Sequence, residues 1–360
     1  MRLLLLPFAF LYQTISWIRN FLYDNGIFKS TGFGISVISI GNLTVGGTGK
    51  TPHTEFLLKN LHKDFNIAML SRGYKRKSKG FLLADENSSF ADIGDEPKQI
   101  KMKCPKIKVA VCKSRVEGVK KLLNHDQNID IIILDDAHQH RKIKAGINIL
   151  LTDYNNLFIH DSFLPYGRLR DNKSQYERAN IIIITKCSTD LKPIDRRIIS
   201  TDINLLPYQK IFFSYIKYGE ITPVFKFKKN KINKETQILL ITGIANSKPL
   251  IEYLEKNISK NITHFDFPDH FSFDKKSIQK INNGFMQIKS DNKIIITTEK
   301  DAVRFRENLL LNDNIKKFFN YIPIEIDFLF ETKEGFNNQI INYVRKNKAN
   351  QRLHSKTNKF

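Results

Sequence analysis

Short apolar runs recur along the chain, separated by segments long enough to form helices. The runs rich in isoleucine, leucine and valine are 35–40, 67–70, 107–111, 129–134, 147–151, 181–184, 238–241 and 294–296. Continuous apolar runs of this length, alternating with helices, are typical of strands that are buried on both faces of a parallel sheet. The pattern therefore predicts an α/β fold in which a mostly parallel sheet is flanked by helices.

The spacing of these runs divides the chain into parts. The first six predicted strands define a core domain over residues 26–214. A stretch rich in Lys and Phe, 215–235, breaks the rhythm and is interpreted as an extended linker. The two later strands predict a second, smaller α/β domain over residues 236–344. Residues 345–360 contain Lys and Arg without Asp or Glu, which predicts a disordered basic tail.

Residues 1–25 follow a different pattern. The uninterrupted apolar stretch Leu3–Tyr12 is about half as long as a membrane-spanning helix requires, and no small-residue cleavage site of a signal peptide follows it. Apolar side chains instead repeat at spacings of three and four, at Leu4, Phe8, Leu11, Ile15, Ile18 and Leu22. This spacing predicts an amphipathic helix on a membrane surface, with Trp17, Tyr12 and Tyr23 at headgroup depth and Arg2 and Arg19 nearby. A helix that packs on the protein's own core is the alternative.

Composition and charge narrow the class of protein. The chain has 360 residues, of which 41% are hydrophobic, so it can bury sizeable cores and is not mainly disordered. The formal net charge of +22 favours anionic partners, such as phosphorylated ligands, nucleic acid or an acidic membrane surface. Cys104, Cys112 and Cys187 form no CxxC pair, which argues against a disulfide scaffold or a zinc site and suits a reducing compartment.

A glycine-rich loop follows the first strand of the predicted core. The sequence GNLTVGGTGKT lies between the run 35–40 and a helix that starts near Pro52. Backbone amides of such a loop close around phosphate oxygens, and the helix N-terminus adds partial positive charge. Lys50 would reach the β- and γ-phosphates and Thr51 would bind Mg²⁺, whereas Thr44 stands where the general GxxxxGK[ST] pattern has glycine. The residues predicted to bind nucleotide are Thr44, Val45, Gly46, Gly47, Thr48, Gly49, Lys50 and Thr51.

An acidic strand end predicts a magnesium site. The run 129–134 leads into Asp135 and Asp136, and a carboxylate at this position lies beside the glycine-rich loop in P-loop proteins. Because consecutive strand residues point to opposite sides, the two carboxylates are expected to have different roles. Strand-end aspartates that only cap the following turn are the alternative. His138 and His140 lack further ligands at suitable spacing and are expected to be solvent-facing or structural, not metal ligands.

Arginines near strand ends are candidate phosphate ligands. Arg72 directly follows the run 67–70, at the end of a parallel sheet where ligands bind. Its guanidinium can hold a phosphate through two parallel hydrogen bonds. Arg115 and Arg170 are weaker candidates of the same kind.

The nucleotide base is predicted from the segment after the run 181–184. A guanine-reading loop would carry an Asn-Lys-x-Asp motif, but residues 185–188 read TKCS. ATP is therefore expected in preference to GTP.

Seven motifs occur in one order along the chain: GNLTVGGTGKTP, SRGY, GDEP, LDDAHQH, LPYGRLRD, FPDHF and TTEKDAVR. This series resembles the tetraacyldisaccharide 4′-kinase family, the lipid A 4′-kinases of Gram-negative bacteria, from the N-terminal helix to about residue 306. Thr44 in the glycine-rich loop is normal for that family. Departures from the family pattern are Ala137, His138, Arg168, Asp171 and Phe271.

The resemblance implies transfer of the γ-phosphoryl of ATP, with Mg²⁺, to the 4′-hydroxyl of a tetraacylated glucosamine disaccharide 1-phosphate, a lipid A precursor. It implies that Asp95 of GDEP is the base that activates this hydroxyl and that His270 of FPDHF pairs with Asp95; without the resemblance, GDEP would be an ordinary turn and His270 a structural histidine. Lys50, at the phosphates, is the predicted catalytic cation. Further candidates for contact with the substrate or its phosphates are Arg72, Glu96, Arg115, Gln139, Arg170 and Asp171. The acyl chains of the acceptor imply peripheral attachment to the cytoplasmic face of the inner membrane. We expect a monomer that binds no nucleic acid.

Two other classes of P-loop protein are alternatives. A GTPase or metallochaperone-type switch predicts a guanine motif and His/Cys clusters, which the sequence lacks. A nucleic-acid-dependent ATPase is compatible with the positive charge but predicts basic–aromatic platforms, whereas the basic residues here are scattered. The lipid kinase is therefore the function that the sequence favours.

Overall fold

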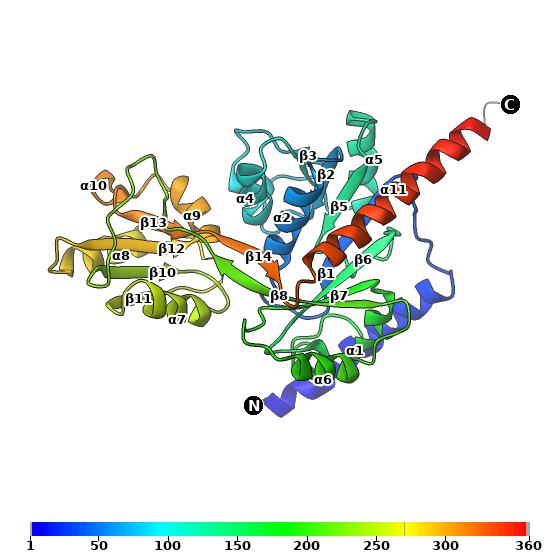
Figure 1. The fold of residues 1–360 in the computed structure, drawn as a ribbon, viewed down its shortest axis with the longest axis horizontal. Helices are drawn as coiled ribbons and strands as arrows, with labels where there is room; N and C mark the ends of the chain where they lie inside the picture. Colours follow the sequence, from blue (N-terminus) through cyan, green and yellow to red (C-terminus); the bar gives the residue numbers. More distant parts are fainter. Residues whose placement is uncertain (1, 270, 358–360) are drawn as a thin grey trace.

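The computed structural model describes residues 2–269 and 271–357, which form two sheets with helices packed around them (Figure 1). The larger sheet has the strand order β14-β8-β7-β6-β1-β5-β2-β4-β3, and the smaller sheet has the order β11-β10-β12-β13-β9. Neighbouring strands run parallel, apart from β3, β9 and β14, which are antiparallel to their partners. The predicted α/β fold with a mostly parallel sheet is confirmed.

The elements have the following bounds. The strands of the larger sheet are β1 (Ser36–Asn42), β2 (Ile67–Ser71), β3 (Leu82–Leu83), β4 (Lys108–Val111), β5 (Ile131–Asp135), β6 (Ile147–Asp153), β7 (Ile181–Thr185), β8 (Lys210–Tyr218) and β14 (Ile324–Phe328). Those of the smaller sheet are β9 (Thr222–Pro223), β10 (Gln237–Thr242), β11 (Ile262–Asp266), β12 (Lys293–Thr298) and β13 (Phe319–Ile322). The α-helices are α1 (Leu6–Asp24), α2 (Lys50–Leu61), α3 (Phe90–Ile93), α4 (Asp95–Lys103), α5 (Arg115–His125), α6 (Pro193–Ile203), α7 (Lys248–Asn257), α8 (Lys275–Gln287), α9 (Glu299–Arg306), α10 (Asp313–Lys316) and α11 (Lys333–Thr357). Short 3₁₀ turns lie at Arg2–Leu5, Phe158–His160 and Lys173–Arg178.

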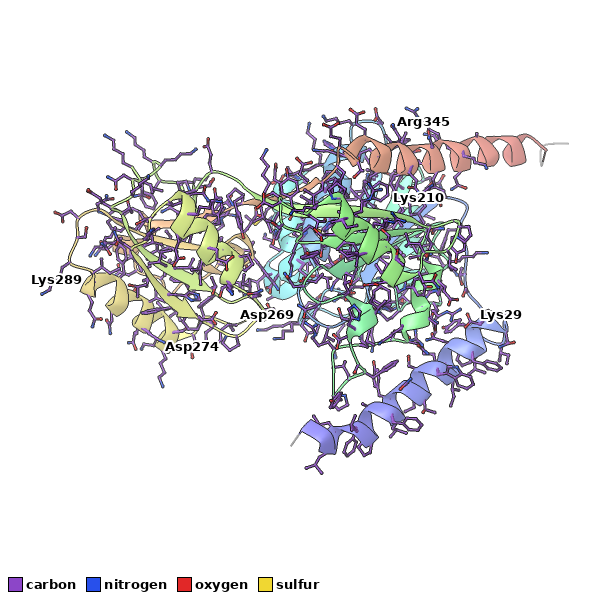
Figure 2. The ribbon with its side chains drawn as sticks, turned by 60° about the horizontal axis from the view of Figure 1, so that its bottom comes forward. Lys29, Lys210, Asp269, Asp274, Lys289 and Arg345 are labelled. Carbon is purple, nitrogen blue, oxygen red and sulfur yellow. The ribbon has the colours of Figure 1, made fainter. Side chains whose placement is uncertain are left out.

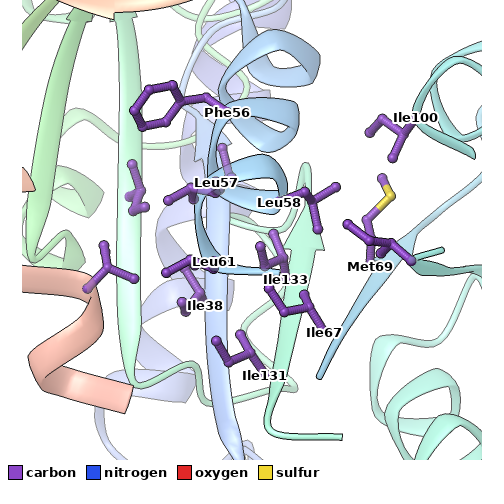
Figure 3. Close-up of a cluster of buried hydrophobic side chains, with 14 of the residues drawn as sticks. Ile38, Phe56, Leu57, Leu58, Leu61, Ile67, Met69, Ile100, Ile131 and Ile133 are labelled. Atoms are coloured by element: carbon purple, nitrogen blue, oxygen red, sulfur yellow. The ribbon is translucent and has the colours of Figure 1, made fainter. Parts of the chain in front are cut away.

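The central strands of the larger sheet are apolar throughout because helices cover both faces of the sheet. Every residue of β1 is buried, as is every residue of β5. Leu57 and Leu61 of α2 lie by Ile38 of β1, and Leu58 lies on the side of Ile133 of β5, in one core cluster (Figure 3). On the opposite face, Val119 and Leu122 of α5 belong to a second cluster, which includes Val37 of β1 and Ile132 and Leu134 of β5.

The C-terminal segment differs from the expected division into domains. β14 pairs with β8, and α11 packs against β1, so the smaller unit ends at β13 and not at residue 344. Phe336, Ile340 and Val344 recur every four residues along α11 and are buried in the core of the larger sheet.

Two further segments also differ from expectation. α11 continues to Thr357, so a disordered tail is wrong for residues 345–357: they contain no Gly or Pro and extend a helix that packing has already nucleated. The expected linker, 215–235, is partly sheet, because its first residues complete β8 and because β9 pairs with β13.

Helices α4 and α9 pack against each other where the two sheets meet. At one end of this contact, Lys103 of α4 lies 2.5 Å from Glu55 of α2 and 2.8 Å from Glu299 of α9. At the other end, Asp95 of α4 is ion-paired with Arg304 of α9. Burial raises the pKa of Glu55 to about 7, against the opposing effect of the Lys103 ammonium. Polar contacts thus fix the smaller unit on the helix that follows the glycine-rich loop.

The N-terminal helix α1 turns small and polar residues toward the protein and most of its large apolar side chains outward. Its large exposed residues are Leu6, Phe8, Phe10, Leu11, Tyr12, Ile15, Trp17, Ile18 and Phe21, and Phe8 is 63% exposed. The side against the body buries Ala9, Ser16 and Asn20. Figure 2 shows α1 on the side of the body opposite to α11. Within residues 2–269 and 271–357, no helix combines the length and apolarity needed to cross a bilayer.

We expect Gly41→Ala to destabilise the protein and to distort the loop after β5. A Cβ at Gly41 would lie 2.6 Å from the Cβ and 2.7 Å from the backbone nitrogen of His138, a buried residue that cannot move aside. Such overpacking costs about 1–3 kcal/mol, which urea unfolding would measure as a lower midpoint. Gly34→Ala is the control, because a Cβ there meets nothing within 4 Å. Equal midpoints for the two variants would contradict this packing.

Candidate active site

The glycine-rich loop connects the end of β1 to the first turn of α2, as its sequence predicted. Gly46 and Gly49 adopt φ angles of +111° and +83°, in the region that favours glycine. The backbone of the loop is tied to its surroundings: the Val45 amide donates to the Arg168 carbonyl at 2.8 Å, and the Thr185 hydroxyl donates to the Thr48 carbonyl at 3.0 Å. This arrangement leaves a helix N-terminus and a fixed loop beside the carboxyl ends of the central strands.

The acidic strand end lies next to this loop because β1 and β5 are neighbours. In their parallel register, Ile40 is opposite Asp135. Lys50 Nζ lies 3.8 Å from Asp136 Oδ1 and 3.2 Å from Asn42 Oδ1. Asp136 has a φ angle of +47°, so the chain turns sharply at the end of β5 and the two carboxylates separate. Thr51, in the first turn of α2, is half-buried.

Arg170 and Gln139 join this group from two loops farther along the chain. Arg170 Nη1 donates to Asp136 Oδ2 at 3.0 Å, and its Nη2 contacts both Asp136 and the side chain of Asn42. Gln139 Nε2 donates to the Asn42 carbonyl at 2.6 Å. Asn42 was missed in the sequence analysis, although a fully buried asparagine at the end of an apolar strand could have indicated a polar contact there.

The two aspartates differ in protonation, as their alternate positions on the strand suggested. Burial raises the pKa of Asp135 to about 7, with further contributions from the negative charges of Glu96 and Asp136. Burial alone would raise the pKa of Asp136 too, but Lys50 and Arg170 outweigh it and hold that pKa well below the usual carboxyl range. One carboxylate is therefore a fixed anion, and the other is poised near neutrality.

Asp95 and Glu96 begin α4, where the helix N-terminus favours negative charge. Glu96 is near enough to Asp135 to raise its pKa, so GDEP and the acidic strand end share one site. Arg304 Nε donates to Asp95 Oδ2 at 3.1 Å, and Arg304 Nη1 lies 2.7 Å from Asp301 Oδ1. Arg304 is a second residue that the sequence analysis missed. The predicted partner of Asp95, His270, lies outside the described residues.

Several predicted ligands occupy other places. Arg115 is 2% exposed and donates to the carbonyls of Cys112 and Asp135, so it supports the acidic strand end from behind. Asp171 is fully buried beneath α1, which is incompatible with an open substrate ligand. Arg72 is exposed at the end of β2 and remains available to an anion.

His138 and His140 follow Asp136 in the loop after β5. His138 is buried and its Nε2 lies 3.0 Å from the Gln175 carbonyl. Burial lowers the pKa of His138 and that of His140 to about 4, so both are neutral at pH 7. Over the described ranges, no three His, Cys, Asp or Glu side chains are grouped so that they could hold a metal ion by themselves.

Comparison with known proteins identifies the family. A family model described as tetraacyldisaccharide-1-P 4′-kinase (LpxK) matches residues 1–345. The chain belongs to this family.

Relatives match this kinase family member over nearly their whole length. Proteins named tetraacyldisaccharide 4′-kinase from Bacteroides thetaiotaomicron and Phocaeicola vulgatus are 43% and 45% identical to it, over 98% and 96% of this chain and 96% of each relative. A crystal structure of LpxK from Aquifex aeolicus, described as an "apo" form in complex with ATP, aligns with a TM-score of 0.73 and 27% identity. That alignment covers 95% of this chain and 99% of the other. The family predicted from the seven motifs is confirmed.

Asp135→Asn is expected to stabilise the free protein at neutral and higher pH. A raised carboxyl pKa means that folding disfavours the ionised form: the penalty is absent below the unfolded pKa near 3.8 and complete above the folded pKa of about 7. The unfolding free energy of the wild type should therefore fall relative to that of the variant between about pH 4 and 7, by on the order of 2–4 kcal/mol.

Urea unfolding in EDTA at several pH values measures this difference. Asp126→Asn is the control, because hydrogen bonds from Lys108, Asn128 and Asn66 lower the pKa of Asp126 to about 2. The stabilisation from Asp126 is already complete above its unfolded pKa, so its variant should differ from the wild type by a constant amount over the same pH range. A constant difference for Asp135→Asn as well would show that Asp135 does not titrate near neutrality.

Proposed function

We propose that this protein is a tetraacyldisaccharide 4′-kinase, which transfers the γ-phosphoryl group of ATP to the 4′-hydroxyl of a tetraacyldisaccharide 1-phosphate in lipid A biosynthesis. The observation that carries the proposal is the convergence of three motifs at one edge of the larger sheet: the glycine-rich loop, the acidic strand end and the GDEP carboxylates. They meet in a chain that the family model matches over residues 1–345. Membership of the family and the names of its relatives support the same activity.

On the phosphate side, Lys50 and Arg170 supply positive charge where phosphoryl transfer spreads negative charge over the oxygens. Both cations now contact Asp136, so an incoming phosphate finds them already oriented. Asp135, Asp136 and Thr51 would hold Mg²⁺, which would neutralise phosphate charge when bound. The fit is supported by Asp135 Oδ2, which is buried without a hydrogen-bond partner among the described residues. ATP is the proposed donor because Thr185 and Ser188 stand where a guanine motif has Asn and Asp, and the similar LpxK structure from Aquifex aeolicus is described in complex with ATP.

On the acceptor side, Asp95 would accept the proton of the 4′-hydroxyl as its oxygen forms a bond to the γ-phosphorus and ADP leaves. The Arg304 guanidinium orients this carboxylate from the smaller unit. The pairing of Asp95 with His270 belongs to the proposal as the family resemblance implies it. Glu96, at the same helix start, is near enough to Asp135 for its charge to raise the pKa of that carboxyl.

The acyl chains of the acceptor require the protein to work at a membrane surface. We propose peripheral attachment to the cytoplasmic face of the inner membrane through the exposed apolar side of α1, as a monomer without a nucleic-acid partner. The structure changes one detail of this picture: Arg19 donates to the Gln139 carbonyl and points toward the body, not toward lipid headgroups. α11, which carries the basic C-terminal residues, lies on the other side of the body (Figure 2).

The activity is tested with [γ-³²P]ATP, Mg²⁺ and the disaccharide 1-phosphate in detergent micelles. We expect a labelled bisphosphate product after thin-layer separation, and we expect Asp95→Asn to lower kcat by about 10²-fold or more with ATP affinity nearly unchanged. Asp85→Asn, an exposed loop aspartate of the same charge, should behave as the wild type. The absence of labelled product from the wild type would remove the proposed activity, and a normal kcat for Asp95→Asn would remove Asp95 as its base.

The membrane proposal is tested with vesicles of phosphatidylethanolamine and phosphatidylglycerol. Phe8→Ser and Leu11→Ser together remove two outward side chains, each worth about 1.5–3 kcal/mol when fully buried. We expect co-sedimentation with the vesicles to fall at least tenfold and ATP affinity to stay the same. Leu309→Ser changes an equally apolar residue that is 97% exposed in the smaller unit, and it should have no effect. Equal loss in both proteins would argue against α1 as the attachment site.

A further inference from the structure

The body-facing side of α1 is held by polar contacts to one buried carboxylate. Asp171 Oδ1 accepts hydrogen bonds from the Ser16 hydroxyl at 2.8 Å and from the Asn20 amide at 2.7 Å. Asp171, Ser16 and Asn20 are 0%, 8% and 3% exposed. A buried carboxylate is costly unless its partners are well placed, so these two donors fix the position of α1 closely.

Asp171 directly follows Arg170, the residue whose guanidinium holds Asp136 and Asn42. The backbone of Arg170 is fixed on both sides: its amide donates to the Leu43 carbonyl at 2.9 Å, and its carbonyl accepts from the Tyr12 hydroxyl of α1 at 3.0 Å. The helix thus holds the main chain of Arg170 through Tyr12 and the side chain of Asp171 through Ser16 and Asn20.

A second loop of the site is attached to the same helix. Arg19 of α1 donates to the Gln139 carbonyl, and Arg141 donates to the Asn20 carbonyl at 3.1 Å. Arg141 also pairs with Asp24 at 2.5 Å. The loop that carries Gln139 is therefore held at two points by α1. The side chains of Gln139 and Arg170 both donate hydrogen bonds to Asn42, which precedes the glycine-rich loop.

We infer that Ser16 and Asn20, acting through Asp171, are positioning residues for the phosphate site: α1 sets Arg170 and Gln139 against Asp136 and Asn42. The helix whose outer side is proposed to meet the membrane would then also complete the nucleotide site on its inner side. The inference rests on the proposed kinase activity for its kinetic test, but nucleotide affinity tests it without that activity.

Removing residues 1–24 would combine the two roles of α1, because it would take away the outer apolar side and also expose Asp171. Point substitutions on the inner side separate them. Ser16→Ala with Asn20→Ala removes both donors that α1 supplies to Asp171, keeps the bond from the Asn172 amide at 2.9 Å, and leaves the outward apolar residues unchanged. Gln13→Ala is the matched control, since Gln13 is an exposed amide on another side of the same helix.

We expect the Ser16→Ala/Asn20→Ala protein to show about tenfold lower kcat and about tenfold weaker binding of ATP with Mg²⁺, measured by calorimetry. Its acceptor KM and its vesicle co-sedimentation should stay normal, which a loss of membrane attachment would not produce. Ser16→Thr keeps the hydroxyl. With Asn20 intact, it should therefore have higher kcat and tighter ATP binding than Ser16→Ala, close to the values of the wild type. Normal kcat and normal ATP affinity in the double variant would overturn the inference.

A double-mutant cycle with Arg170→Ala shows whether the effect passes through Arg170. If it does, adding Ser16→Ala/Asn20→Ala to Arg170→Ala should cost much less than it costs in the wild type. If the factors by which kcat falls in the two parent variants simply multiply in the combined variant, Ser16 and Asn20 act independently of Arg170, and the inference is overturned.

The inference can still be tested if the wild type proves inactive as a kinase or if the double variant does not fold. If the wild type binds ATP but transfers no phosphate, the proposed function fails, and the ATP affinities of the same variants still decide the inference. If the double variant does not fold, as judged by its melting temperature, Ser16→Ala alone is measured instead. This single variant loses one of the two donors and is expected to lower kcat and ATP affinity by a smaller factor in the same direction.

Discussion

The parallel pairing of β1 with β5 is the constraint on which the rest of the site depends. Both strands are buried along their whole length, so a shift of register would move apolar side chains out of the core on both faces. The register that results places Asp135 opposite Ile40 and brings the acidic strand end to the glycine-rich loop. With the strands in this register, Lys50 at the start of α2 lies 3.8 Å from Asp136.

Charge balance organises the side chains that gather there. Asp136 is paired with Lys50 and Arg170, and Asp95 is paired with Arg304, so two carboxylates at the site are held by cations from other segments. Asp135 is the exception: burial dominates its environment, and its pKa is raised to about 7. The free site thus holds oriented cations for phosphate together with one carboxylate whose ionisation a bound cation would favour.

The two sheets contribute unequal parts to one site. The larger sheet supplies the phosphate loop, the acidic strand end and Asp95, whereas the smaller unit supplies Arg304 from α9. Lys103, between Glu55 and Glu299, links α2, α4 and α9 at the far end of the same contact. Because Asp95 and Lys103 are the two ends of α4, the position of the proposed base depends on how the smaller unit rests on the phosphate-loop helix.

The sequence by itself determined the class of fold, the phosphate loop, the acidic strand end and the family. Each of these can be recognised from short segments whose residues are close together along the chain. Continuous apolar runs indicated buried parallel strands, and the run GNLTVGGTGKT contains both the glycines and Lys50. Local pattern also predicted the amphipathic character of α1, whose apolar side chains are exposed along one side.

Only the tertiary structure decided which distant groups meet. Arg304 reaches Asp95 across 209 positions, and Asp171 lies 155 positions from Ser16, separations at which sequence spacing carries no information on contact. The same limit explains why Asp171 and Arg115 were expected among the ligands although both are buried supports. It also explains why the C-terminal segment was assigned to the smaller domain: the pairing of β14 with β8 is a contact between edges, and only the folded sheet shows which edge is open.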